Sequence, residues 1–302
     1  MATGTRLRPR GTVSRFSDVV ARSEAALAGL RRRVRWIDHL WRAAARFDEY
    51  FGLRLAAAIA YYGFFAAFAI SLLAFSVLGF VLAGNQAAAR AATAYLDRNL
   101  PFLRVEDIAG ARGTIAVVSA VALVFAGVAW IDSMRSAQRA MWQLEQSPGN
   151  FVIRWLVDFA ILVGLGLLLA VSLFLSSRIQ AEAPSFASGV VGLILAQLIN
   201  FVMSAGLLVG VPRLWVSTSR VSVAVVLVGL GITALTTVGQ VYVQRTSNNP
   251  AYQVVSVAAG LLVFLYLFSQ LLLFGAAWAA TGRGRVRDLA AGPQPPAEPA
   301  DR

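Results

Sequence analysis

Long apolar stretches constrain the fold of this chain more than any other feature. Six of them are long enough to cross the hydrocarbon core of a bilayer, which takes about 20 residues. They cover residues 53–82, 113–131, 152–176, 187–210, 221–243 and 252–280. Only 18 of the 42 charged residues lie between positions 55 and 280, too few to coat a soluble domain of that length. The sequence therefore predicts an all-α polytopic membrane protein with a bundle of six transmembrane helices, and it excludes a soluble enzyme or a disordered protein for this part of the chain.

The prolines give an independent check on these boundaries. Proline lacks a backbone N–H and clashes with the preceding helical turn, so it collects between helices. One proline falls in each of the five predicted loops, and none falls inside a predicted span. These loop prolines are Pro101, Pro148, Pro184, Pro212 and Pro250.

The arginine distribution predicts the orientation in the membrane. With the N-terminus inside, 21 arginines lie on the inner side and 6 on the outer side, and the chain contains no lysine. Because basic residues favour the cytoplasmic side, both termini are expected to be cytoplasmic. Arginine without lysine is typical of a GC-rich genome and suggests a bacterium, so the expected location is the plasma (inner) membrane. The expected organisation is a cytoplasmic Arg-rich leader (1–50), the six-span membrane domain (51–282) and a disordered cytoplasmic tail (283–302).

An amphipathic juxtamembrane helix is expected in the leader, from about residue 17 to residue 50. Arginines alternate there with apolar residues and tryptophans, a pattern typical of helices that lie on a membrane surface. The arginines expected to contact anionic phospholipid headgroups are Arg31, Arg32, Arg33 and Arg35. No RNA-binding motif accompanies them, so nucleic acid is not an expected partner.

A second amphipathic helix is expected on the cytoplasmic surface after the second span, ending at Pro148-Gly149. Its apolar face would hold Met134, Ala137, Met141 and Leu144, and its polar faces Arg135, Gln138, Arg139, Gln143 and Gln146.

Three segments resemble a known family. They are the sequence AAAIAYYGFF at 56–65, Trp130 followed by Met134, Arg135 and Ala137 through Trp142, and the sequences LYL at 265–267 and LFGA at 273–276. In this order, on a six-span frame, they resemble the YihY/BrkB (YhjD-like) bacterial inner-membrane proteins, once labelled as a ribonuclease. The resemblance implies a role in envelope integrity and a proposed role in transport. The chain departs from the family at Ala69, where a proline is usual, and at Ala277, where a glutamate is usual.

Asp158 is the acidic residue that lies within a predicted span, which makes it a functional candidate. Arg154 lies four residues earlier on the same helix face, so an interfacial Arg154–Asp158 ion pair is the alternative. A polar substrate cavity built from Tyr61, Asp158, Asn200 and Gln270 is the functional hypothesis. Packing is the competing interpretation for the small and polar residues around Asn200, because polar side chains often join spans.

The residue content argues against an enzyme. The chain has no cysteine and one histidine, His39, so neither thiol chemistry nor a metal or other cofactor is expected. Two functions remain open: transport or lipid translocation in the envelope, and a non-transporting envelope scaffold that binds partners. The lipid bilayer is the expected surrounding in both, and a homo-oligomer or an envelope protein partner fits either.

Overall fold

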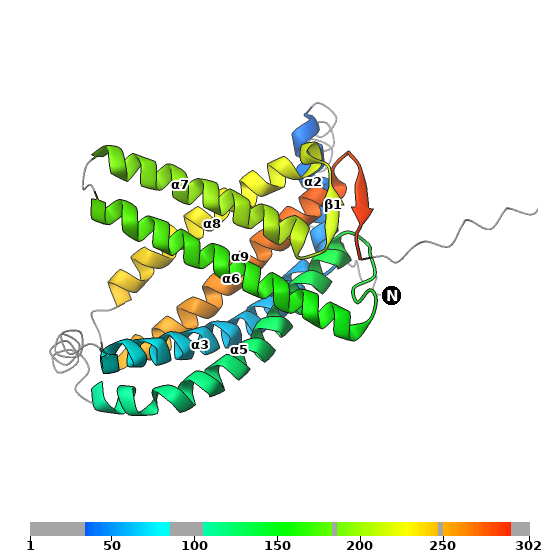
Figure 1. The fold of residues 1–302 in the computed structure, drawn as a ribbon. Helices are drawn as coiled ribbons and strands as arrows, with labels where there is room; N and C mark the ends of the chain where they lie inside the picture. Colours follow the sequence, from blue (N-terminus) through cyan, green and yellow to red (C-terminus); the bar gives the residue numbers. More distant parts are fainter. Residues whose placement is uncertain (1–33, 85–104, 183–185, 247–249, 291–302) are drawn as a thin grey trace, which may run out of the picture.

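The computed structural model describes residues 34–84, 105–182, 186–246 and 250–290, and these residues are almost all helical (Figure 1). The helices are α2 (Arg35–Glu49), α3 (Gly52–Gly84), α5 (Val105–Met141), α6 (Phe151–Glu182), α7 (Phe186–Ala205), α8 (Thr218–Thr246) and α9 (Pro250–Thr281). A π-helical turn, η1 (Gly206–Gly210), continues α7. Two short strands, β1 (Leu214–Val216) and β2 (Val286–Asp288), complete the described elements.

Within the described residues, five helices contain a segment long and apolar enough to cross a membrane: α3, α5, α6, α8 and α9. The sixth, α7, contributes a shorter apolar segment that runs into η1, from Ile194 to Gly210. The prediction of an all-α polytopic membrane protein is confirmed. Each of the six predicted apolar stretches corresponds to one of these long helices.

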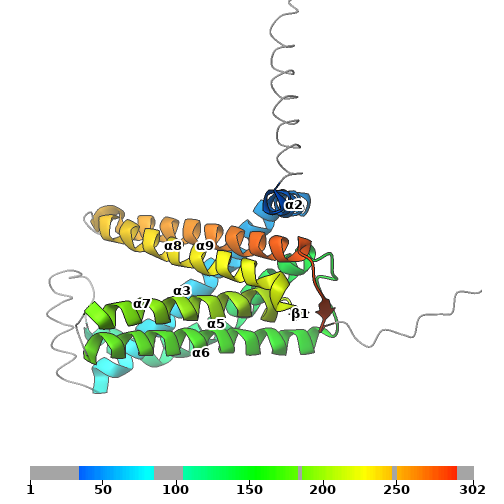
Figure 2. The same cartoon turned by 90° about the horizontal axis from the view of Figure 1, so that it is seen from above.

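The six long helices form a ring. Each packs against the next in the order α3, α5, α6, α7, α8 and α9, and α9 closes the ring by packing against α3. Figure 2 shows α8 and α9 side by side in one layer and α5, α6 and α7 on the opposite side. Helix α2 crosses one end of the bundle, where it contacts α9 and α3.

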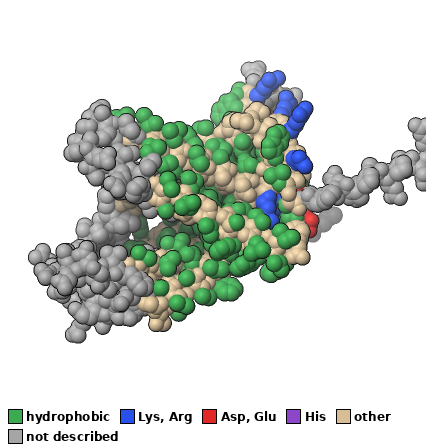
Figure 3. All heavy atoms as spheres, viewed as in Figure 1, with side chains coloured by type: hydrophobic (Ala, Val, Ile, Leu, Met, Phe, Trp, Pro, Cys, Tyr) green, Lys and Arg blue, Asp and Glu red, His purple; other side chains and the backbone are tan. Residues whose placement is uncertain are grey.

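That end differs from the other in charge and in packing, and we call it the basic end. It comprises α2, the starts of α3, α6 and α8, the ends of α5 and α9, and both strands. Every arginine whose side chain is described lies there, as the blue atoms of Figure 3 illustrate for one face. The core lies there too, with Ile131, Met134, Leu208 and Leu273 among its buried side chains. The opposite end is called the far end.

Helices α6 to α9 are much less covered toward the far end. Asp158 is the one described residue of α6 that is buried, and Ser204 is the one described residue of α7 that is buried. Both lie near the basic end. Helix α8 has no described buried residue after Gly229, and α9 has none before Leu265. Figure 3 shows the visible face hollowed toward the far end, with apolar side chains around the recess.

The prediction of a separate surface helix after the second span is wrong. Helix α5 runs without interruption through the second span to Met141, and the chain then turns through residues 142–150. The predicted polar face is covered, because Arg135, Gln138 and Arg139 are each 0% exposed.

The two predictions about the ends of the chain can be compared with the structure. Helix α2 corresponds to the second half of the helix expected over 17–50, whereas residues 17–33 lie outside the described part of the chain. The tail expected to be disordered from residue 283 instead contains β2, which pairs antiparallel with β1 in the register Leu214↔Asp288 and Val216↔Val286. That prediction is wrong for these residues because their partner strand lies 70 to 74 positions away in the sequence.

Candidate functional site

A buried ion-pair network at the basic end joins three segments that are distant in the sequence. The carboxylate of Asp158, on the second turn of α6, is 1% exposed. From α5, Arg135 Nε donates to both of its oxygens at 3.2 and 3.4 Å. From the loop between η1 and β1, Arg213 Nη2 donates to Oδ1 at 2.8 Å. Two guanidinium groups therefore share one carboxylate, which ties α6 to both neighbouring segments.

Arg135 has no access to solvent, so each of its nitrogens needs an acceptor. Besides Asp158, its Nη2 pairs with Asp132, one helical turn earlier on α5, and its Nη1 donates to the carbonyl of Gln146 at 2.7 Å. The second carboxylate offsets the excess positive charge of the network. Each of the three Arg135 nitrogens thus has an acceptor, and the chain after α5 is folded back onto this side chain.

Arg213 reaches the network from a constrained backbone. Its φ of +60° lies in the left-handed region, directly after Pro212. Its Nη2 also donates to the carbonyl of Arg154 at 2.9 Å. Burial lowers the pKa of Arg213 from its ordinary value, while the negative charge of Asp158 acts in the opposite direction and favours the charged form.

A second buried arginine holds the C-terminal strand. Arg139 lies one turn after Arg135 and makes two parallel bonds to Asp288 of β2, Nη1 to Oδ1 at 3.0 Å and Nη2 to Oδ2 at 2.7 Å. It also donates to the carbonyls of Pro212 and Glu145. This two-pronged geometry is the strong form of an arginine–carboxylate pair. It fixes β2 against the end of α5.

Two further arginines satisfy carbonyls at helix ends, where the last four C=O groups lack partners within the helix. Arg46 of α2 donates to the carbonyl of Met141, the last residue of α5, at 3.1 Å. At the end of α9, Arg220 of α8 donates to the carbonyls of Ala279 at 2.8 Å and Ala280 at 2.6 Å. The arginines of the basic end therefore cap helices and connect them at once.

The structure corrects the predicted partner of Asp158. Arg154 does not pair with it, although the two residues are four apart on α6. The Arg154 side chain instead points to Asp132 at 3.7 Å and donates to the carbonyl of Ser147 at 3.2 Å. Local spacing identified the wrong arginine, because Arg135 and Arg213 are distant from Asp158 in the sequence and the fold brings them into contact with it. Arg213 was missed as a site residue, although its place beside a loop proline at the end of a span was a usable signal.

The prediction that the polar face of residues 134–146 is exposed is also corrected, because distant segments of the chain cover it. Arg135 and Arg139 do not face solvent, since loop carbonyls and the carboxylates of Asp158 and Asp288 surround them. Gln138 lies between them in the sequence, and its buried amide has no partner among the described residues.

The four proposed cavity residues belong to four different helices, α3, α6, α7 and α9. Tyr61 is 58% exposed, and its ring contacts Tyr62 and Phe65 of its own helix. Asn200 donates to Thr233 of α8 at 3.0 Å, which agrees with the packing interpretation. Gln270 is partly buried on α9, and Asp158 belongs to the network. The pockets described below contain none of these four residues.

Of the four predicted headgroup contacts, the structure describes one. Arg35 is exposed at the start of α2, and Arg31, Arg32 and Arg33 lie outside the described residues. Within the described part of the chain, no group of three or more His, Asp or Glu residues could hold a metal ion. Both carboxylate oxygens of Asp158 accept hydrogen bonds from guanidinium groups, so Asp158 connects α6 to α5 and to the loop before β1.

Comparisons with known proteins agree with this architecture. A family model described as virulence factor BrkB matches residues 43–300. An uncharacterized protein of Dickeya dadantii (strain 3937) is 26% identical over 277 residues, which cover 83% of this chain and 84% of that protein. The inner membrane protein YhjD of Escherichia coli (strain K12) is 25% identical over 272 residues, 81% of each chain. No solved structure matches.

Proposed function

The chain belongs to the BrkB family, and from this premise we propose that it moves an amphipathic molecule, such as a lipid, through the bacterial inner membrane in support of envelope integrity. It is an integral, multi-pass protein of that membrane. The proposal includes six membrane spans, α3 and α5 to α9, with the basic end in the cytoplasm. It includes no enzymatic step.

Uneven packing is the observation that carries this proposal. The basic end is closed by a buried core and by ion pairs, whereas the described residues of α6 to α9 are unburied toward the far end. In lipid, separating apolar helix faces carries no hydrophobic penalty, so these halves can move apart at little cost. A bundle that is closed on one side and divergent on the other has the form of one state of an alternating-access cycle.

A pocket between α8 and α9 favours an amphipathic cargo over a polar solute. It has a volume of about 540 Å³ and lies toward the far end, with Gly239, Tyr242, Gly260 and Phe264 in its wall. An adjoining pocket of about 240 Å³ shares these four residues and extends toward Leu267. The walls are mostly apolar, which suits an acyl chain better than an ion.

The test measures the exchange of a fluorescent phospholipid between the two leaflets of proteoliposomes. An impermeant reductant bleaches only the label in the outer leaflet, so the fraction of protected label reports the exchange. We expect the protein to increase the exchange rate above that of protein-free vesicles. A Cβ at Gly239 meets only Phe264, at 3.7 Å, so Gly239→Leu fills the pocket without backbone strain and should slow exchange several-fold. Gly164→Leu on α6, where a Cβ meets nothing within 4 Å, is the matched control.

No increase with any of several lipid classes would remove the transport proposal. A stoichiometric partner captured by mild crosslinking would then favour the scaffold function instead.

The orientation has its own test, which the natural absence of cysteine makes simple. Arg287→Cys, on the exposed side of β2, should resist an impermeant thiol reagent in intact cells and react after lysis. Tyr95→Cys, between the first two predicted spans, should react in intact cells. The reverse pattern would invert the proposed topology.

A further inference from the structure

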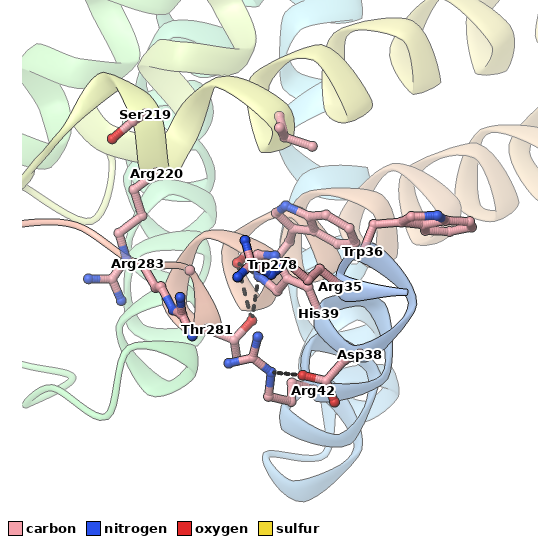
Figure 4. A pocket seen from close by; sticks show the side chains of 12 residues that line it. Arg35, Trp36, Asp38, His39, Arg42, Ser219, Arg220, Trp278, Thr281 and Arg283 are labelled. Atoms are coloured by element: carbon pink, nitrogen blue, oxygen red, sulfur yellow. Dashed lines mark hydrogen bonds and ion pairs between the residues drawn. The ribbon is translucent and has the colours of Figure 1, made fainter. Parts of the chain in front are cut away.

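A large basic pocket opens at the basic end, separate from the buried network. It has a volume of about 970 Å³ and lies between α2, the start of α8 and the end of α9. Figure 4 shows four arginines around it, Arg35 and Arg42 from α2, Arg220 from α8 and Arg283 just after α9. Asp38 is the acidic residue in the lining, so the side chains contribute a net charge of +3 with His39 neutral.

The four arginines are not equally free to bind a ligand. Arg220 donates hydrogen bonds to the carbonyls of Ala279, Ala280 and Gly284. Arg42 Nε pairs with Asp38 at 3.1 Å. Arg35 and Arg283 are exposed and make no ion pair within the described part of the chain. These two guanidinium groups therefore face the pocket with their donors available for an anion.

The rest of the lining mixes polar side chains with two tryptophans and a valine. The His39 ring stacks on Trp278, with centroids 4.3 Å apart, and its Nε2 donates to the Trp278 carbonyl at 2.9 Å and to Thr281 Oγ1 at 3.1 Å. These contacts fix α2 against the end of α9. The first turn of α8, with Ser219, and the last turn of α9 both border the pocket. Their dipole ends have opposite signs, so the net attraction for an anion comes from the arginine side chains.

The pocket lies at the level where headgroups meet water. The apolar segments of α8 and α9 begin at Thr218 and end at Thr281, and both of these helix ends border it. Trp36 is 62% exposed on its rim, which is the usual position of a tryptophan that anchors a protein at the membrane interface.

We propose that this pocket binds a phosphate-bearing anion through Arg35 and Arg283, with the other arginines supplying charge. A planar guanidinium group binds two phosphate oxygens at once in a bidentate geometry, and the positively charged lining would repel a cation. An anionic phospholipid headgroup and a free phosphate ester share this chemistry. The inference does not depend on transport, since it concerns binding at one membrane surface.

The test measures the affinity of the full chain in detergent micelles at about 0.15 M salt, where long-range attraction is screened beyond about 8 Å. The ligands are short-chain phosphatidylglycerol, short-chain phosphatidylcholine and glycerol 3-phosphate. We expect phosphatidylglycerol to bind more tightly than phosphatidylcholine. Glycerol 3-phosphate binding as tightly as phosphatidylglycerol would identify a free phosphate ester as the ligand, and much weaker binding would identify a lipid.

The variants separate a built site from general basic charge. R35Q/R283Q removes two exposed guanidinium groups from the pocket and should raise the dissociation constant at least about tenfold, since each loses a charge-assisted bond. R285Q/R287Q removes the same charge from exposed positions at the same end, outside the pocket, and should change it less than about threefold. Ser219→Asp, which adds a negative charge to the lining, should also weaken binding.

Equal weakening by the two double variants, equal affinity for both lipids, or no binding of phosphatidylglycerol and glycerol 3-phosphate would overturn the proposal. None of these outcomes bears on leaflet exchange, so the proposed function is judged separately.

Discussion

Replacing Asp158 with asparagine tests whether the buried network holds the basic end closed. Asparagine keeps the shape of the side chain and removes its charge, so Arg135 and Arg213 lose their shared anion. Removing one partner of a buried ion pair costs about 3–5 kcal/mol. Both arginines keep other acceptors, which places the expected loss at the lower end, about 3 kcal/mol.

Asp132→Asn is the matched control. Asp132 also pairs with Arg135, and the substitution is chemically identical, but its side chain is 46% exposed. Ion pairs with that much solvent contribute at most about 1 kcal/mol. The two variants therefore differ in burial and not in the kind of bond that is lost.

A single cysteine in the core reports opening of the basic end, because the natural chain has none. Ala137→Cys places a thiol at a position that is 2% exposed on α5. If closing is faster than labelling, the rate of modification by a maleimide follows the population of the open state. A loss of about 3 kcal/mol then corresponds to a roughly 100-fold faster rate. The required regime is verified by a rate proportional to maleimide concentration.

We expect Asp158→Asn to accelerate labelling roughly 100-fold and Asp132→Asn less than about tenfold. Equal acceleration by the two variants would refute the reasoning, because burial would then not decide the strength of the pair. An Asp158→Asn effect below about fivefold would show that the network does not hold the basic end closed.

Three further predictions concern packing and buried polar groups. Gly63→Ala should destabilise the protein by about 1–3 kcal/mol, because its Cβ would lie 2.8 Å from an indole nitrogen of α5, whereas Gly164→Ala has open space and should be neutral in the same thermal melt in detergent. Gln138→Met should leave the melting temperature unchanged or raise it, since it removes a buried amide with no described partner, and a fall of several degrees would reveal a hidden partner. Arg139→Gln should release strand β2 from α5, and faster proteolysis after residue 282, with the helices still protected, would detect the release.

The sequence predicts the membrane helices well, because one physical requirement determines them. A span needs about 20 apolar residues without proline, and that requirement is local. The helices α3 and α9, for example, begin within two residues of the predicted starts at 53 and 252. The placement of Pro148 and Pro212 in loops also agrees with the structure.

The site was predicted poorly because its contacts are not local. The sequence singles out Asp158 because it lies within a predicted span, yet its partners lie 23 and 55 positions away. Arg135 and Arg139 were assigned to a solvent face because periodicity separates polar from apolar faces without saying what covers each. Loop carbonyls and β2 cover this polar face, and no pattern within residues 134–146 indicates them.

The distribution of strong and weak contacts suggests how the molecule would open. At the basic end, arginine side chains connect different segments of the chain. Arg46 joins α2 to α5, Arg220 joins α8 to α9, and Arg139 joins α5 to β2. Lysine, a point charge, could not bond several carbonyls in one plane as these guanidinium groups do. Nearer the far end, α7 and α8 are joined by two neutral bonds at Thr233, which accepts from Asn200 and donates to Gln197. Bonds of this type are worth about 0.6 kcal/mol each in membranes. Breaking the buried pair at Asp158 costs about 3 kcal/mol, more than these two neutral bonds together. We therefore expect α6 and α7 to separate from α8 first at the far end, with the basic end acting as the fixed pivot.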